Sequence, residues 1–188
     1  MEIADKSSVG AAVQKAFLKN DSIGKLLTIA ARMERGGQTR KIRVKLEIDC
    51  RPPAGSQFTT SYLTFPTVTP LTTQTLESSF ALKLHALFCR QYVKGRDWFD
   101  LIWYVSRRPP VSPNFRLLKN ALAQTGPWAG EKLAVDAAWV RDALAQTIRK
   151  INWNVARQDV QRFLPLSEQA GLQNWKAGFF LQLAGKII

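Results

Sequence analysis

The chain changes from strand to helix within residues 69–90, which read TPLTTQTLESSFALKLHALFCR. Up to Thr75 the segment is rich in threonine and interrupted by proline, a composition that favours short strands. From Leu76 onward the apolar residues recur at three- and four-residue intervals, which predicts a helix with one apolar face. We therefore expect a β-rich part over residues 1–75 and a helical part over residues 76–188, which makes the fold class α+β.

The strongest strand signal upstream of this boundary covers residues 41–50. Its apolar face carries Ile42, Val44, Leu46, Ile48 and Cys50, and its polar face carries Lys41, Arg43, Lys45, Glu47 and Asp49. Such strict alternation is typical of a strand with one face in the core. We expect this strand to form a hairpin with residues 25–34. Further strands are expected at 58–65 and 71–75, and a short helix within 8–20.

Downstream of the boundary, prolines and glycines separate a series of helical segments. The pattern predicts helices at residues 76–90, 96–107, 114–125, 135–151, 155–164 and 172–187. The expected architecture is thus a small sheet followed by a C-terminal helical bundle.

The charge of the chain stands out. It has 188 residues, of which 46% are hydrophobic and 10% aromatic, enough to build a core. Lys and Arg number 27 against 14 Asp and Glu, which gives a net charge of +13 and a pI near 10.2. This surplus favours a polyanionic partner such as nucleic acid or a nucleotide. A soluble basic protein without such a partner is the alternative.

Composition excludes several chemistries. Two cysteines cannot form a disulfide framework, and a single histidine argues against a His-based zinc site or a Ser-His-Asp triad. Neither GxxxxGK[ST] nor GxGxxG occurs in the sequence. No apolar run reaches the ~18 residues needed to span a bilayer, and the first residues contain no signal-peptide core. We therefore expect a cytoplasmic protein with reduced thiols and no membrane partner.

Glu47 and Asp49 form the first candidate site. They lie two residues apart on the predicted strand, so both project from one face, with Lys45 beside them. Carboxylates at this spacing can coordinate Mg²⁺ or act as a base in phosphoryl chemistry. The alternative is the exposed polar face of a half-buried strand, whose charges serve solubility.

Lys83 is the second candidate. On a helical wheel it lies within about 20° of Leu76 and about 40° of Leu87, inside the apolar stripe of its helix. A lysine there needs an anionic partner or must extend to an opening. A phosphate-binding role and simple snorkelling both fit this position. His85 falls about 180° from Lys83 and is expected at an exposed or edge position.

The third candidate is the segment Lys94-Gly95-Arg96-Asp97-Trp98-Phe99-Asp100. Asp97 and Asp100 share a face in the first turn of a predicted helix, where the helix dipole and the free N–H groups favour acids. Helix capping therefore accounts for the two acids. It does not account for Lys94 and Arg96, which the same dipole disfavours. The following residues are apolar almost all round, so the acids mark the point where a buried helix reaches polar surroundings.

In chain order these three segments resemble the AbiEii family, the nucleotidyltransferase-like toxins of type IV toxin–antitoxin and abortive-infection systems, which include the MenT toxins. The resemblance rests on KLEID at 45–49, FALKLHAL at 80–87 and KGRDWFDL at 94–101, and it is good over about residues 40–107. It implies a polymerase-β-like nucleotidyltransferase fold, here a partial mixed sheet followed by a helical bundle. It also implies a toxin–antitoxin or phage-defence function.

The resemblance further implies roles for individual residues. Glu47 or Asp49 matches the third acidic position of the family's site, with Mg²⁺ as the metal. Lys83 matches the lysine that contacts nucleotide phosphates, and Asp97 matches the acid of the last motif. The implied catalytic residues are Glu47, Asp49, Lys83 and Asp97, and the implied phosphate-binding residues are Lys45, Lys83, Lys94 and Arg96. The implied partners are a nucleoside triphosphate, tRNA and a cognate antitoxin.

The sequence departs from the family in its first motif. In the family a G-G/S turn followed by D-x-D supplies the main metal ligands, and Gly36-Gly37 is followed by no such pair. Two-metal nucleotidyl transfer needs several carboxylates to hold Mg²⁺ in line with the triphosphate. We therefore expect a truncated or catalytically degenerate member of the family. The alternative is a non-catalytic basic module that binds nucleic acid or an antitoxin-like partner.

Overall fold

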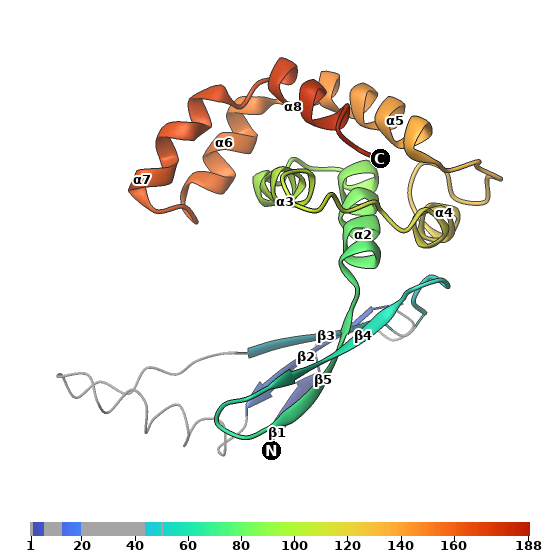
Figure 1. The fold of residues 1–188 in the computed structure, drawn as a ribbon, viewed down its shortest axis with the longest axis vertical. Helices are drawn as coiled ribbons and strands as arrows, with labels where there is room; N and C mark the ends of the chain where they lie inside the picture. The colour runs from blue at the N-terminus through green and yellow to red at the C-terminus, as the bar shows by residue number, and fades with distance from the viewer. Residues whose placement is uncertain (1, 6–12, 20–43, 50) are drawn as a thin grey trace. The chain divides into compact units, whose positions relative to one another are not determined.

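The structure is a computed structural model that describes residues 2–5, 13–19, 44–49 and 51–188 (Figure 1). The chain divides into two compact units, residues 1–52 and residues 53–188. We refer to them as the sheet unit and the helical unit, and each is described by itself.

The described part of the sheet unit is a three-stranded antiparallel sheet. Its strands are β1 (Glu2–Asp5), β2 (Val13–Lys19) and β3 (Val44–Asp49), in the order β1-β2-β3. The register of β2 against β3 runs from Val13 opposite Asp49 to Leu18 opposite Val44. The strand predicted within residues 41–50 is confirmed over its described length.

Two expectations for the sheet unit need comment. The short helix predicted within residues 8–20 is wrong, because residues 13–19 form the central strand β2. A short apolar run fits both the helical and the strand period, and pairing with a neighbour on each side decides between them. Residues 25–34, expected to pair with β3, lie outside the described part of the chain. Within that part, β3 pairs with β2.

The helical unit begins with a two-stranded antiparallel ribbon, β4 (Phe58–Leu63) and β5 (Thr69–Gln74). Both strands were predicted from the sequence and are confirmed. Nearly all of their residues are exposed, and Phe65 in the connecting turn is 85% exposed. The base of the ribbon is fixed to the helices by the buried hydroxyl of Ser78, which accepts hydrogen bonds from Gln57 N and Asn114 Nδ2 at 3.0 and 3.1 Å.

The rest of the helical unit consists of short helices joined by brief loops. They are α2 (Leu76–Cys89), α3 (Gly95–Val105), α4 (Phe115–Gln124), α5 (Ala137–Lys150), α6 (Trp153–Gln161), α7 (Leu166–Gln169), a 3₁₀ turn η1 (Ala170–Asn174) and α8 (Ala177–Ala184). Four of them begin at a side chain that accepts a backbone N–H, as helix N-termini require. These N-caps are Thr75, Asn114, Asp136 and Asn152.

The last predicted helix, residues 172–187, is only partly correct. The chain leaves helical geometry at Trp175 and Lys176 before α8 begins. Trp175 is buried edge-on against Phe180, with ring centroids 5.2 Å apart. Burying this large ring stabilises the fold more than continuing the helix through Trp175 would. The periodicity of the sequence does not reveal this, because it reports only the local helical pattern.

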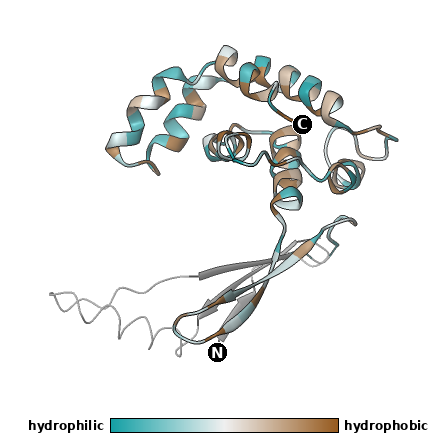
Figure 2. Ribbon diagram, in the orientation of Figure 1, coloured by the Kyte–Doolittle hydropathy of each residue, from teal (hydrophilic) through white to brown (hydrophobic). Residues whose placement is uncertain are grey.

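The core of the helical unit surrounds α2, which lies against α3, α4 and α5, while α3 also contacts α6 and α5 contacts α8. Leucines such as Leu84, Leu101, Leu117 and Leu144 are fully buried. Figure 2 shows apolar and polar residues mixed along most helices, which gives each an apolar face for the core. None of the described helices is long and apolar enough to cross a membrane. The strand-then-helix order confirms the predicted α+β class.

Candidate functional site

Two ion pairs join α2 to the first turns of α3. Lys83 Nζ lies 2.5 Å from Asp100 Oδ2, and Arg90 Nε lies 2.8 Å from Asp97 Oδ2. The cations are seven residues apart, about two helical turns, and the acids are three apart, about one turn. The two sequence motifs therefore meet in space, with Asp100 paired to Lys83 of α2 and Asp97 paired to Arg90, the residue that follows α2.

The surroundings of Lys83 agree with the prediction made from its place in the apolar stripe of the helix. It follows the buried residues Phe80 and Ala81 and precedes the buried Leu84, and its side chain is 43% exposed. It therefore has the anionic partner that such a lysine needs, and it also extends toward solvent. The ammonium can be reached by a ligand, so phosphate binding by Lys83 stays a prediction.

Tyr104 lies in the surroundings of this pair. Its ring stacks on Phe80 with centroids 4.6 Å apart. Burial raises the pKa of the Tyr104 hydroxyl, the positive charge of Lys83 lowers this pKa and the negative charge of Asp100 raises it. The Lys83–Asp100 pair thus sits at the edge of an aromatic part of the core.

Asp97 is the most buried charged group of the predicted site, with its side chain 5% exposed. Lys94 occupies the N-cap position of α3, and among the described residues no side chain caps that helix. Arg90 Nε and Asp97 Oδ2 are both buried and form no hydrogen bond within the described part of the chain apart from their ion pair. Asp97 therefore serves to hold α3 against α2, and a catalytic role for it stays a prediction.

Gly95 allows α6 to approach the start of α3. Its N–H donates to Asp159 Oδ2 at 2.8 Å, and a Cβ at this position would collide with the carbonyl oxygen of Ala156. Asp159 also pairs with Arg162 at 3.0 Å. The glycine of the K-G-R-D segment is thus required by the packing of α3 against α6.

The side chains of Arg96 and Lys94 lie in different surroundings. Arg96 is exposed, and its guanidinium lies over the ring of Phe163, 4.2 Å from the centroid. Arg162 lies over the same ring at 4.8 Å. Lys94 is half-buried and lines a cavity on another side of α3, whose lining does not include Arg96 or Lys83. The four expected phosphate-binding residues therefore do not form one cluster in the helical unit.

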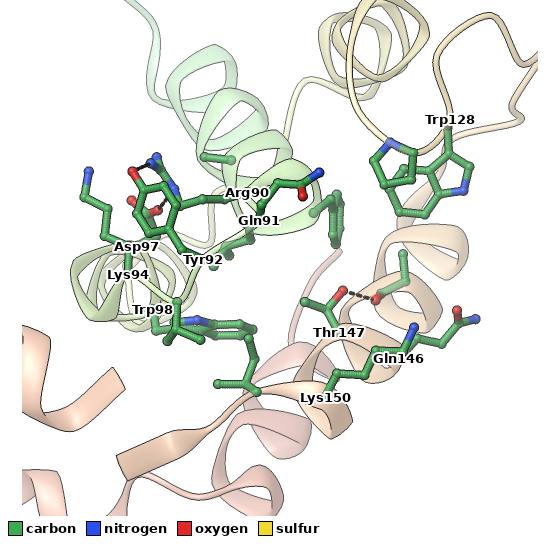
Figure 3. A pocket seen from close by; sticks show the side chains of 17 residues that line it. Arg90, Gln91, Tyr92, Lys94, Asp97, Trp98, Trp128, Gln146, Thr147 and Lys150 are labelled. Atoms are coloured by element: carbon green, nitrogen blue, oxygen red, sulfur yellow. Dashed lines mark hydrogen bonds and ion pairs between the residues drawn. The ribbon is translucent and has the colours of Figure 1, made fainter. Parts of the chain in front are cut away.

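That cavity has a volume of about 360 Å³ and is formed by the end of α2, the loop to α3, the first turn of α3, the α4–α5 connection and the last turns of α5. Figure 3 shows Lys94 and Arg90 on one side and Lys150 with Gln146 and Thr147 on the other. We call it the α2–α5 cavity. The sequence did not reveal this cavity, because α5 comes some forty residues after the K-G-R-D segment. Lys94, Asp97 and Trp98 belong to that predicted segment, but the sequence does not show that α5 lies opposite them.

The remaining site residues belong to the sheet unit. In the register of β3, Lys45 is opposite Phe17 and Glu47 is opposite Lys15. Strand alternation places residues 45, 47 and 49 on one face. Asp49 is exposed, and its Oδ1 accepts a hydrogen bond from Arg51 N at 2.9 Å.

The donor set for Mg²⁺ is small. Within the described ranges there is no group of three His, Cys, Asp or Glu that could hold a metal ion. Asp97 and Asp100 are paired with cations, which leaves Glu47 and Asp49 as the carboxylates of the predicted set. Two carboxylates can contribute ligands to one magnesium ion, whereas two-metal transfer requires a larger set.

Comparison with known proteins identifies the family. The family model described as "Nucleotidyl transferase AbiEii toxin, Type IV TA system" matches residues 3–179. No curated protein and no solved structure matches the chain. The family match covers nearly the whole sequence, including all three motifs and the helices that follow them up to the start of α8. The chain therefore belongs to the AbiEii family of nucleotidyltransferase toxins of type IV toxin–antitoxin systems.

Proposed function

We propose that this chain is a nucleotide-binding but catalytically degenerate AbiEii protein of a toxin–antitoxin pair. Its ligand is a nucleoside triphosphate, with tRNA as the implied nucleic-acid target. The observation that supports this most directly is the position of Lys83, a half-exposed cation on a rigid helix with an exchangeable anionic partner.

The ammonium of Lys83 is held in a partly solvent-exposed ion pair that a phosphate can replace. Asp100 holds it 2.5 Å away in a partly solvated pair, with the side chains 43% and 35% exposed. A phosphate carries more charge and more acceptor oxygens than a carboxylate, so it can replace Asp100 as the partner of Lys83. In this scheme Asp100 orients the lysine in the free protein and competes with the ligand.

The proposal that the protein is catalytically degenerate rests on the small number of carboxylates available to hold metal ions. The sequence contains no D-x-D, and the acids of α3 are occupied by Lys83 and Arg90. In the sheet unit, Glu47 and Asp49 would be the carboxylates for Mg²⁺, an ion that neutralises phosphate charge. Among the described residues there is no group of three or more metal-binding side chains for the second metal of an in-line displacement. We therefore propose binding without transfer.

Binding is tested by calorimetric titration of each nucleoside triphosphate with Mg²⁺. Lys83→Ala should weaken binding about tenfold or more, since it removes a charge-assisted hydrogen bond. Asp100→Asn should strengthen binding, because the competing carboxylate is gone. Lys119→Ala removes one exposed charge from α4 and is the matched control. Unchanged affinity of Lys83→Ala would contradict the proposal.

Transfer is tested by incubating the protein with Mg²⁺, each labelled triphosphate and tRNA. We expect no labelled tRNA above background. Robust transfer would show that the chain is an active enzyme and would overturn degeneracy, while leaving the binding role of Lys83 intact.

A second candidate function, a non-catalytic module that binds RNA or an antitoxin-like partner, is favoured by arginines stacked on exposed aromatic rings. Besides Arg96 and Arg162 over Phe163, Arg107 lies over the half-exposed Trp103 at 4.8 Å. Guanidinium–aromatic pairs of this kind also stack on unpaired bases. RNA binding by such a surface should weaken steeply between about 50 and 200 mM salt and should tolerate Lys83→Ala. A salt-independent affinity would count against it.

A further inference from the structure

We propose that the α2–α5 cavity is a second binding site, distinct from Lys83, which takes a nucleoside monophosphate unit, either as a free mononucleotide or as the 5′-phosphorylated end of an RNA strand. The inference does not depend on the triphosphate site, because the cavity is lined by other residues. Its volume, charge and side-chain chemistry each point to this class of ligand.

The volume suits one small molecule. About 360 Å³ lies near the lower end of the range of about 300–1,000 Å³ that is usual for small-molecule sites. The walls come from three stretches of sequence, residues 86–98, 127–128 and 143–151, which belong to one compact unit. A cavity of this size accommodates a single nucleotide unit more readily than a longer segment of strand.

The charge of the lining selects an anion. Arg90, Lys94 and Lys150 face one acid, Asp97, whose carboxylate is already paired with Arg90. Among the described residues neither Lys94 nor Lys150 has an ion-pair partner. Lys150 also sits in the last turn of α5, where the helix dipole favours a cation, and its flexible stem still lets the ammonium reach a ligand. The lining of the cavity therefore carries more positive than negative charge, which attracts the phosphate of a bound nucleotide unit.

The uncharged lining suits a flat ring with polar edges. Trp128 lies on the rim and is held edge-on by Phe88 and Trp139, at centroid distances of 6.0 and 5.5 Å. Gln91 and Gln146 are exposed amides with both donor and acceptor atoms. Thr147 Oγ1 donates to Ala143 O at 2.9 Å, which leaves its oxygen free to accept (Figure 3). Stacking on an aromatic ring and amide contacts to base edges are the usual means of holding an unpaired base.

The test measures binding of AMP, GMP, CMP and UMP by calorimetry and by tryptophan fluorescence. Inorganic phosphate is the probe for a plain anion site. A short RNA with a 5′-phosphate and the same RNA with a 5′-hydroxyl distinguish a strand end from a free mononucleotide. Trp128→Phe identifies the part of the fluorescence change that comes from this ring, and near-UV circular dichroism verifies that each variant is folded.

We expect Lys94→Gln and Lys150→Gln each to weaken binding about tenfold, while Lys186→Gln, a matched loss of one exposed lysine, leaves it unchanged. If only the 5′-phosphorylated RNA binds, the ligand of the site is the end of an RNA strand. If the mononucleotides bind, the ligand is a free nucleotide. Two results would overturn the proposal: unchanged affinity in Lys150→Gln, or phosphate binding as tightly as any nucleotide without a change in Trp128.

Lys83→Ala separates this site from the triphosphate site. Loss of mononucleotide binding in that variant would place the mononucleotide at Lys83 and remove the second site. Loss of triphosphate binding alone would leave both proposals standing. Unchanged triphosphate binding, with monophosphate binding still sensitive to Lys150→Gln, would remove the Lys83 proposal and keep the cavity.

Discussion

Arg90 is the single residue on which the position of α3 depends most. It supplies the only charge partner that the buried carboxylate of Asp97 has within the described part of the chain. Its guanidinium also donates to Tyr92 Oη at 2.5 Å and lies over that ring. The arginine thus connects the end of α2, the loop and the start of α3.

We expect Arg90→Met to lower the free energy of unfolding by about 3 kcal/mol, because it leaves Asp97 buried and unpaired. A value at the lower end of the usual range fits an arginine side chain that is 26% exposed. The double variant Arg90→Met with Asp97→Leu should recover most of the loss, since it removes both charges. Urea denaturation measures both, with Arg96→Met as the control for an exposed arginine. Equal stability of Arg90→Met and the wild type would contradict a structural role for the pair.

His85 gives the protein a pH-dependent stability. Burial lowers the pKa of His85 below its usual 6.5, and hydrogen bonds to the backbone of Thr125 and Ala121 oppose this shift. The unfolded chain then takes up a proton more readily than the folded protein. The contribution of His85 is therefore fully present above about pH 6.5 and is lost as the pH falls toward the lowered pKa.

Unfolding measured from pH 5 to pH 8 checks this expectation. The wild type should lose stability below about pH 6.5, and His85→Gln should show a flatter profile over that interval. The amide keeps a polar group beside Thr125, whose hydroxyl lies 3.1 Å from the ring nitrogen, but it does not titrate. Parallel profiles for the two proteins would assign the pH dependence to other groups.

At the residue scale the sequence could predict that Lys83 needs a partner, but not which one. The apolar stripe shows that a lysine at this position is unusual. The sequence shows that Asp100 lies on the same helix face as Asp97. It does not show that α3 packs against α2, so Asp100 could not be identified as the partner of Lys83. For the same reason Lys150 and Trp128 could not be placed beside Lys94, since each comes from a separate element.

At the scale of elements, the crossing of α3 and α6 depends on the absence of a side chain at Gly95. Gly95→Ala should lower the free energy of unfolding by about 1–3 kcal/mol, the usual effect of overpacking, because the new methyl group meets backbone atoms of Ala156 and Val160. Backbone cannot move aside as a flexible side chain can. Thermal unfolding followed by circular dichroism measures the effect.

Gly178→Ala in α8 is the matched control. Nothing lies within 4 Å of the Cβ that this change adds, so it should leave stability unchanged or raise it by up to about 1 kcal/mol. If both substitutions changed stability equally, the loss at Gly95 would reflect backbone propensity and not the contact with α6.

The elements themselves show where sequence patterns are sufficient. The helices α2 to α6 match their predicted ranges because each combines an apolar face with a cap or a proline break. The strand β2 and the break at Trp175 were missed, because each is decided by a partner that is distant in sequence: two neighbouring strands for β2, and Phe180 with the core for Trp175. Local periodicity does not report such partners.

At the scale of the whole molecule, the family was predictable from three short segments, and the match over residues 3–179 confirms it. The positive charge is spread over the chain, and residues 76–188 carry 16 basic and 8 acidic residues. Two of those acids are occupied by ion pairs in the predicted site, so the cations around it outnumber the available anions. Charge thus supports a polyanionic ligand without identifying it.

The ribbon of β4 and β5 predicts a response to salt that is opposite in sign to the one expected for RNA binding. No charged residue lies between Arg51 and Glu77, although the chain as a whole carries +13. In dilute buffer this charge keeps copies apart, and near 1 M salt it is screened beyond about 3 Å. The exposed strands and rings such as Tyr62 are then free to pair with those of another copy.

We therefore expect the osmotic second virial coefficient, measured by light scattering, to be positive in dilute buffer and to become negative as salt rises. Thr60→Lys, which places a charge on an exposed strand residue, should keep the coefficient positive. An unchanged salt response in that variant would exclude the ribbon as the contact. If the proposed RNA binding holds, low salt should favour both the solubility of the protein and its binding of nucleic acid, so colloidal stability and nucleic-acid contamination should rise together during purification.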